Sequence, residues 1–256
     1  MPTKRLLIMG GTHEARTLAN RAVESWGVHV DVITSLAGRT RDARLPKGNV
    51  RHGGFGGQTG IEAFLHDEAI DAVIDATHPF AAQISRHTAR ACDAAGVPHV
   101  VLDRPRWKLP DGLDVRRVVD MTAAAETIAE MQIGTVLVTV GHRDLDALSN
   151  LNNVRFLVRQ IEAHEAPLPL ANSERIIQRP PFDHASERAL MQDQEIDALL
   201  TKESGGEATA AKLQAAAELA IPVIMIERPD PPAGDCVETV DLAFEWAVST
   251  LGLEAG

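Results

Sequence analysis

Glycine and hydroxyl residues follow the first apolar segment of the chain, where a nucleotide phosphate could bind. The sequence RLLIMGGTHEA places Gly10, Gly11 and Thr12 between a predicted strand and a predicted helix. Glycines let the backbone approach a phosphate, and the amides at a helix start attract negative charge. The fingerprint G-x-G-x-x-G is not matched, because Thr12 and Ala15 stand at its second and third glycine positions. We expect a modified phosphate-binding loop, with a plain tight turn as the alternative.

The end of the second predicted strand lacks the acidic residue with which NAD-binding folds hold the ribose hydroxyls. In VITSLAGRT, Thr34 and Ser35 occupy this place and Arg39 follows. Without a carboxylate the site would not repel a 2′-phosphate, and two hydroxyls with an arginine could bind one. The pattern favours NADPH as the cofactor. The alternative is that Ser35 only caps a helix.

A third polar loop follows the strand predicted at 72–75. DATHPFA places Thr77 and His78 at the end of this strand, and Pro79 suits the first turn of the next helix. Ligands of open α/β sheets bind beyond the carboxyl ends of the strands. Thr77 and His78 therefore stand where a ligand would bind, although a single histidine is more often structural.

Two loops in the second half of the chain have the residue types of an anion site. VTVGHRDL places an arginine after a predicted strand, and LLTKESGGEAT places a lysine, a serine and two glycines before a helix. Glycine turns of this kind bind anions through backbone amides, but the spacing is not that of a Walker A loop. The alternative is that the Lys-Glu pair faces solvent. The candidates are Arg143, Lys202, Glu203, Ser204, Gly205 and Gly206.

The charge balance bears on the partners. With 25 basic and 36 acidic residues the net charge is −11, which argues against nucleic-acid binding. The stretch 39–51 is locally basic, however, because Arg41, Arg44 and Lys47 are opposed only by Asp42. A cationic patch on an acidic protein favours an anionic small ligand; a solvated loop is the alternative.

Several functional classes are not indicated. Neither an H-E-x-x-H pattern nor clustered His and Cys residues predict a metal, and no G-x-S-x-G sequence predicts a hydrolase nucleophile. Cys92 and Cys236 lack C-x-x-C spacing, so we expect neither a disulfide framework nor a zinc site. No apolar run approaches the roughly 20 residues of a membrane span, and the early strand leaves no room for a signal peptide. A cytoplasmic location without membrane contact is expected.

Short apolar runs alternate with segments of helical periodicity, which is typical of stacked βα units with mostly parallel sheets. These strands and helices must position the polar loops. The segment DRPRWKLPDGLD, residues 103–114, contains two prolines and a glycine and predicts a link. We expect two Rossmann-like α/β domains with a cleft between them: a cofactor-binding domain at 1–108 and a second domain at 109–256. A weak strand at 115–119 could join either sheet. Strands are predicted at 5–9, 28–33, 49–52, 72–75, 98–102, 136–140, 154–158, 176–178, 198–201 and 223–226, and helices at 14–25, 58–66, 81–95, 122–131, 184–192, 207–219 and 241–250.

Five motifs in order resemble one family. MGGTHEAR, VITSLAGRT, DATHPFA, VTVGHRDL and LLTKESGG are similar to the precorrin-6A reductase (precorrin-6x reductase) family of cobalamin biosynthesis, over essentially the whole chain. The resemblance implies an oxidoreductase acting on CH–CH bonds, which uses NADPH to reduce one double bond of the precorrin-6A macrocycle to precorrin-6B. The family also has a cobalt-precorrin branch. The many carboxylates of a precorrin would explain local cations at a cleft.

The resemblance also implies roles for the candidate residues. The first loop would face the cofactor phosphates, the second strand end the adenosine, and the third loop the nicotinamide. The second-domain loops would close the cleft and contact substrate. The implied cofactor residues are Gly10, Gly11, Thr12, Thr34, Ser35, Arg39, Thr77, His78, Pro79, Ser204, Gly205 and Gly206, and the implied substrate residues are Arg143, Lys202 and Glu203.

The proton donor stays open at this point, because Lys202, His78, Glu203 and water are all candidates; Lys202 and His78 are the preferred two. The expected partners are the tetrapyrrole substrate and, by hand-over, neighbouring enzymes of the pathway. The alternatives are an NADP-dependent reductase of another polyanion, a non-catalytic NADP(H) sensor, and a nucleotide-sugar enzyme.

Overall fold

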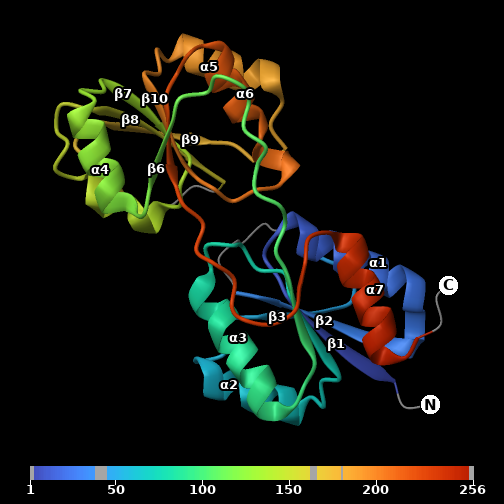
Figure 1. Cartoon of the computed structure of the whole chain (residues 1–256). Coiled ribbons are helices and arrows are strands. Elements are labelled where there is room, and N and C mark those ends of the chain that lie inside the picture. Colours follow the sequence, from blue (N-terminus) through green and yellow to red (C-terminus); the bar gives the residue numbers. More distant parts are fainter. Residues whose placement is uncertain (1–2, 38–44, 162–165, 180, 254–256) are drawn as a thin grey trace. The chain divides into compact units, whose positions relative to one another are not determined.

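The computed structural model describes residues 3–37, 45–161, 166–179 and 181–253, apart from the side chains of residues 142, 143 and 208. The chain forms two compact units (Figure 1). Unit 1 comprises Met1–Pro105 and Pro229–Gly256, and unit 2 comprises Arg106–Arg228. The chain therefore passes from one unit to the other twice.

Among its described residues, unit 1 contains a six-stranded sheet in which every pairing is parallel. Its strands are β1 (Lys4–Met9), β2 (Val30–Leu36), β3 (Asn49–His52), β4 (Ala72–Asp75), β5 (His99–Leu102) and β12 (Cys236–Val237). Their order is β12-β5-β4-β1-β2-β3. The order reverses between β1 and β4, which is where doubly wound sheets bind ligands.

Helices cover both faces of this sheet (Figure 1). They are α1 (His13–Trp26) and α7 (Val240–Leu251) on one face, and α2 (Gln58–Asp67) and α3 (Ala82–Ala95) on the other; the short 3-10 helix η1 is Gly27–His29. Because successive strand residues point to opposite faces, Leu6 and Ile8 pack with α1 and α7, whereas Leu7 and Met9 pack with α2 and α3. Burial on both faces explains why β1 is a continuous apolar run.

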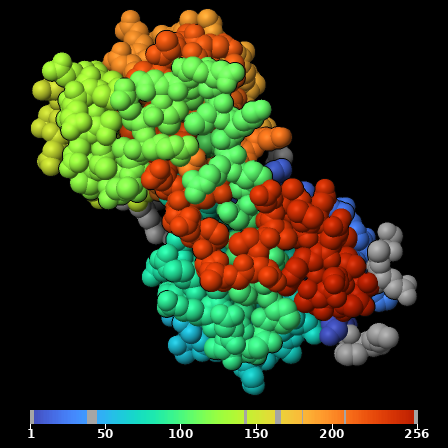
Figure 2. Space-filling model, in the orientation of Figure 1, coloured from blue at the N-terminus to red at the C-terminus, as the bar shows by residue number. Residues whose placement is uncertain are grey.

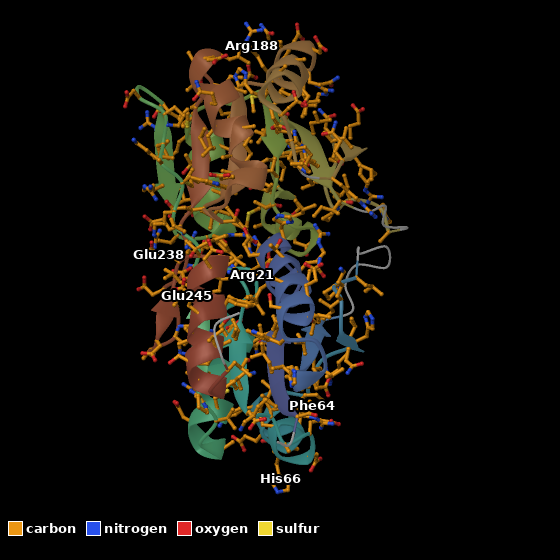
Figure 3. The ribbon with its side chains drawn as sticks, turned by 90° about the vertical axis from the view of Figure 1, so that its right-hand side faces the viewer. Arg21, Phe64, His66, Arg188, Glu238 and Glu245 are labelled. Atoms are coloured by element: carbon orange, nitrogen blue, oxygen red, sulfur yellow. The ribbon has the colours of Figure 1, made fainter. Side chains whose placement is uncertain are left out.

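The C-terminal segment differs from the expected domain division. Residues 229–256 were expected in the second domain, but β12 pairs with β5 and α7 packs on α1 in unit 1. The Phe244 ring of α7 stacks on Trp26 of α1, with ring centroids 4.6 Å apart, and Arg21 of α1 lies 4.1 Å from the centre of the same ring. Figure 2 shows this segment, in red, on the surface of unit 1, and Figure 3 shows Arg21 beside α7. The apolar face of α7 is equally suited to either sheet, so periodicity alone could not assign it.

Unit 2 repeats the architecture, with a six-stranded parallel sheet among its described residues. Its strands are β6 (Val115–Val118), β7 (Thr135–Val138), β8 (Arg155–Gln160), β9 (Ser173–Ile177), β10 (Ala198–Lys202) and β11 (Val223–Ile226). Their order is β6-β11-β10-β7-β8-β9. The helices are α4 (Met121–Glu130), α5 (His184–Asp193) and α6 (Ala211–Glu218), with 3-10 helices η2 (His142–Leu148) and η3 (Glu207–Thr209).

The two sheets share one strand arrangement. Counted along the chain from β1 in unit 1 and from β7 in unit 2, the first five strands of each sheet occupy the same relative positions. The strand order of unit 2 therefore reverses between β7 and β10, as that of unit 1 does between β1 and β4. The sixth strand of each sheet, β12 or β6, follows a passage between the units. The strand at 115–119, which the sequence left unplaced, pairs with β11 in unit 2. The helix predicted at 207–219 is divided, because η3 precedes α6.

Within the described ranges, no helix is long and apolar enough to cross a membrane.

Candidate functional site

The two glycines after β1 have different structural roles. The Gly10 amide donates to the Ser35 carbonyl at 2.9 Å, and a Cβ at Gly10 would lie 2.8 Å from Cγ2 of Thr34. Gly11 has a φ of 114°, and no described atom lies within 4 Å of a Cβ built there. Gly10 therefore allows β1 and β2 to pack closely, whereas Gly11 leaves open space at the start of α1. Open space beside a helix N-terminus suits an anion.

The Thr12 hydroxyl connects the loops that follow β1 and β4. It accepts a hydrogen bond from the Ala15 amide at 3.1 Å, which caps α1, and donates to the Ala76 carbonyl at 2.8 Å. The family resemblance implied that Thr12 faces the cofactor phosphates. In the structure its hydroxyl proton is directed to the Ala76 carbonyl, so Thr12 fixes the loop that surrounds the open space.

Replacing Thr12 with valine is expected to lower the free energy of unfolding by about 1–2 kcal/mol, because a cap and a bridging hydrogen bond are lost together. Thr12→Ser keeps the hydroxyl and is expected to stay within about 0.5 kcal/mol of the parent protein. Urea unfolding of the three proteins measures both values. Equal losses in the two variants would show that the hydroxyl is not responsible.

Two hydroxyl residues lie at the carboxyl end of β2, as expected. Thr34 and Ser35 are 1% and 5% exposed, and Thr34 Oγ1 has no hydrogen-bond partner among the described residues. Ser35 lies in register between Met9 of β1 and Arg51 of β3. Among the described residues of this strand end, 34–37, none is acidic. Arg39, Arg41 and Arg44 fall outside the described residues, and Lys47 pairs with Glu24.

Arg51, the last residue of the basic stretch 39–51, supplies a cation at this strand end, a position that the sequence alone did not assign to it. Its Nη1 lies 3.4 Å from Ser35 Oγ and donates to the Gly53 carbonyl at 2.6 Å. The guanidinium carbon lies 3.7 Å from the ring centre of Phe55 and 5.4 Å from that of Phe64, which is labelled on α2 in Figure 3. These contacts hold the guanidinium plane beside Ser35. Only the strand order, which pairs β3 with β2, reveals this placement.

A pocket lies beyond the carboxyl ends of β4 and β5. The buried Asp75 carboxylate accepts hydrogen bonds through Oδ1 from the Thr77 amide and hydroxyl, at 3.0 and 2.7 Å. Its second oxygen, Oδ2, is buried without a hydrogen-bond partner among the described residues. The sequence analysis predicted Thr77, His78 and Pro79 near a ligand, and the pocket lining includes all three. The other polar lining residues are Asp75, Ser85, Asp103 and Asp230.

His78 is exposed at the mouth of this pocket. Its Nδ1 accepts a hydrogen bond from the Phe80 amide at 3.2 Å, and the two rings are 5.9 Å apart. An Nδ1 that accepts a hydrogen bond leaves the proton of a neutral imidazole on Nε2. In its neutral form, His78 would therefore carry a hydrogen-bond donor at Nε2.

In unit 2, the residues predicted at the loops after β7 and β10 lie at the corresponding switch point. Lys202 ends β10 and donates to Asp144 Oδ2 in η2, so its charge is paired. Arg143 belongs to the same 3-10 helix, but its side chain lies outside the described part of the chain. This ion pair brings the end of β10 close to η2, without a contact that assigns chemistry to either.

The Glu203 side chain is buried and paired with arginines rather than exposed to an open site. Its carboxylate is 1% exposed and binds Arg106 through Oε2 and Arg117 through Oε1, the latter at 2.9 Å. The Arg228 Nε donates to its carbonyl at 3.2 Å. Burial opposes ionisation, but hydrogen bonds and charge from Arg117 and Arg106 outweigh it and lower the pKa of Glu203. Glu203 is an internal anion of unit 2, which argues against both the expected substrate contact and the solvent-facing alternative.

The glycine turn after Glu203 is anchored from the start of unit 2. Gly205 and Gly206 have φ values of 66° and 81°, which favour glycine, and Ser204 is buried. The indole Nε1 of Trp107 donates to the Gly206 carbonyl at 2.7 Å. Together with the Arg106 pair, this contact ties residues 106–107 to the turn.

The sequence did not indicate that two cations on α6 and β8 of unit 2 are buried. Lys212, on α6, is 6% exposed and donates to Thr139 Oγ1 at 3.2 Å. Arg159, on β8, is 7% exposed and pairs with Glu187 at 2.8 Å. Burial, with a smaller contribution from the charge of Arg159, lowers the pKa of Lys212 to about 7. Lys212 and Arg159 belong to no sequence motif, because the helix and strand segments that carry them have no distinctive residue pattern.

The geometry is suited to two kinds of binding. Unit 1 offers an open helix start, an acid-free strand end with a fixed arginine, and a pocket with an unpaired carboxylate oxygen. Unit 2 places cations at its switch point. Within the described residues, no group of three His, Cys, Asp or Glu side chains is arranged to hold a metal ion.

Comparisons with known proteins agree over the length of the chain. The profile of the family described as "Precorrin-6x reductase CbiJ/CobK" matches residues 5–248. A precorrin-6A reductase from Rhodococcus erythropolis is 45% identical, over 96% of this chain and 98% of that protein. The precorrin-6A reductase of Mycobacterium tuberculosis strain H37Rv is 42% identical, over 94% and 96%.

A solved structure described as "CobK precorrin-6A reductase" has the same fold. It is 34% identical, covers 97% of both chains, and superimposes with a TM-score of 0.90. The expected α/β class with two Rossmann-like parallel sheets is confirmed.

Proposed function

Because this chain belongs to the precorrin-6x reductase family, we propose that it uses NADPH to reduce one double bond of precorrin-6A and so gives precorrin-6B. The family assignment confirms the resemblance found in the five motifs. The observation that carries the proposal is similarity over nearly the whole chain, both to precorrin-6A reductases and to the CobK structure. The hydride donor, the product and the individual site residues are the parts that need testing.

Unit 1 has the features that an NADPH site needs. Open space at Gly11 adjoins the amides at the start of α1, which suits the phosphates. The strand end at Thr34 and Ser35 has no carboxylate, and its buried hydroxyl at Thr34 lacks a partner among the described residues. Arg51 adds a cation beside Ser35. These residues favour a 2′-phosphate, with Arg39 retained from the sequence analysis as a second candidate cation.

Bound NADPH would supply the hydride, and the chain would orient it and provide a proton. The pocket at Asp75, Thr77, His78 and Pro79 is the proposed nicotinamide side. His78 is the preferred proton donor, because it lines this pocket and histidine is the side chain that most often acts as a general acid. Lys202 is the second candidate, and its pair with Asp144 favours a binding role. The proposed contributions of unit 2 are Ser204, Gly205 and Gly206 toward the cofactor and Arg143 toward the substrate.

Replacing Arg51 with alanine is expected to weaken NADPH binding by about tenfold or more and to leave NADH binding nearly unchanged. A charged hydrogen bond to phosphate is lost in the first case only. Fluorescence titration with each nucleotide measures this. Arg21→Ala is a matched control, because Arg21 also lies over a phenylalanine ring but pairs with Asp241 on α7. Equal weakening for both nucleotides would refute the proposed 2′-phosphate contact.

The reaction itself is tested by turnover. The protein with precorrin-6A and NADPH should oxidise one NADPH per macrocycle and give a product heavier by two hydrogen atoms. An NADP(H) sensor would bind NADPH without turnover, and a reductase of another polyanion would leave precorrin-6A unchanged. A cobalt-precorrin-6A reductase from Methanothermobacter thermautotrophicus is only 31% identical, compared with 45% and 42% for precorrin-6A reductases. We therefore propose the cobalt-free substrate.

A further inference from the structure

Unit 2 contains a buried cluster in which positive charge exceeds negative charge. Lys212 and Arg159 supply two cations, and Glu187 supplies one carboxylate; all three residues are at most 7% exposed. Nη1 of Arg159 binds Glu187, but Nε and Nη2 are buried without hydrogen-bond partners among the described residues. Lys212 has a neutral partner, the Thr139 hydroxyl. Buried donors of this kind are costly unless an acceptor reaches them.

The cluster lies where doubly wound sheets bind ligands. Thr139 directly follows β7, Arg159 is the last residue but one of β8, and Lys212 is in the first turn of α6. Alternation along the strands puts Thr139 and Arg159 on the face that α5 and α6 cover, with Leu137 and Leu157. The carboxyl ends of β7 and β8 adjoin the switch point with β10.

Aromatic rings cover the two cations. Lys212 Nζ lies 5.1 Å from the centre of Trp107, and the Arg159 guanidinium carbon lies 4.4 Å from the centre of Phe182. Phe182 is half-buried and lies between β9 and α5. The guanidinium therefore lies beneath a ring at the surface, and displacement of that ring would give an anion access.

We propose that Lys212 and Arg159 bind one carboxylate of the substrate at the carboxyl edge of the second sheet. The inference rests on the proposed macrocyclic substrate, which carries acetate and propionate groups. The arriving carboxylate accepts hydrogen bonds from Lys212 and from the two unpaired nitrogens of Arg159, and it balances the excess charge. Charge-assisted hydrogen bonds of this type are among the strongest in proteins.

Proton uptake should accompany this binding. Lys212 titrates near pH 7 without the anion, and a bound carboxylate favours its charged form. Above pH 7, binding then takes up one proton, and affinity for the macrocycle should fall by up to about tenfold per pH unit. The charged groups that act on Lys212 are Arg159 and Glu187. His184 and Arg188 of α5 instead lie at ion-pair distance from Glu218 of α6.

Steady-state kinetics of Lys212→Met tests the site. We expect KM for precorrin-6A to rise about tenfold or more, with KM for NADPH unchanged, and the fall in macrocycle affinity above pH 7 to disappear. The control is Lys4→Met, because Lys4 is a lysine paired with Asp71 at the amino end of β1. It should leave both constants unchanged.

Other outcomes would overturn the inference in distinct ways. A rise in KM for NADPH alone would assign the anion to a cofactor phosphate, and two unchanged constants would leave Lys212 a structural residue. If the parent protein does not turn over precorrin-6A, the proposed function fails instead. Equilibrium binding of uroporphyrin, a tetrapyrrole with eight carboxylates, then tests the site, with Lys212-dependent binding expected and Lys212-independent binding contradicting it. The pH dependence of the parent protein gives an answer even if a variant misfolds.

Discussion

Replacing Glu203 with alanine is expected to lower the free energy of unfolding of unit 2 by about 2–3 kcal/mol. The substitution removes the anion that Arg106 and Arg117 share and leaves the space of a 1% exposed side chain. Breaking a buried pair costs about 3–5 kcal/mol. The two arginines are 47% and 41% exposed, so they can turn to water and the cost is smaller. Urea unfolding followed by tryptophan fluorescence measures it, since Trp107 contacts the same turn.

The pH dependence of the same pair of proteins separates charge from packing. The pKa of Glu203 is lowered by its arginines, so its stabilisation is present above the ordinary glutamate pKa and is lost as pH falls through the folded value. The difference between the parent and Glu203→Ala proteins should therefore shrink in acid. Glu203→Gln keeps the shape without the charge and should show a smaller loss at neutral pH. A pH-independent difference would mean that packing alone is responsible.

Lys212→Met is expected to have the opposite effect on stability. The folded pKa of Lys212 is about 7, below its ordinary 10.5, because burial penalises the charge. The loss of stability caused by the buried lysine is greatest at and below pH 7. It decreases as pH rises toward 10.5, because the unfolded chain then also loses the proton. A shift of this size corresponds to a gain on the order of several kcal/mol for the methionine variant at pH 7. Thermal unfolding at pH 7 and pH 10 tests it.

Lys4→Met provides the reference for this measurement. Its side chain is 42% exposed and pairs with Asp71, so its loss should change stability little at either pH. A Lys212→Met protein that is less stable than the parent, or equally stabilised at both pH values, would contradict the assignment. A gain in stability together with a rise in KM for the macrocycle would mark Lys212 as a residue that costs stability and serves binding.

Much of the fold follows from the sequence because parallel strands are buried on both faces. The continuous apolar runs of β1 and β4 are strand signals for this reason, and turns rich in glycine and proline separate them from helices. Strand order does not follow. The edge strand β12 has two residues, and the amphipathic pattern of α7 is compatible with either sheet. The sequence therefore could not show that 229–256 returns to unit 1.

The candidate site was predictable to the extent that loops after strands carry its residues. Gly11, Thr34, Ser35 and the 77–79 loop lie at the carboxyl ends of β1, β2 and β4, as expected from position. The contacts of Arg51 and Glu203 depend on which strands are neighbours in the sheet. The role proposed for Lys212 depends on the burial of its side chain where α6 packs on the sheet. None of these is a local property of the sequence. Function therefore has to be tested at residues that motifs do not mark.

The double passage of the chain has a consequence for synthesis. Unit 2 is a continuous segment, whereas the core of unit 1 includes Ala243, Ala247 and Leu251, near the end of the chain. A ribosome releases these residues after the whole of unit 2. The nascent protein can fold unit 2 first, while Trp26 of α1 stays uncovered until α7 emerges. Unit 1, whose strands β1 to β5 precede unit 2 in the chain, thus finishes folding after it.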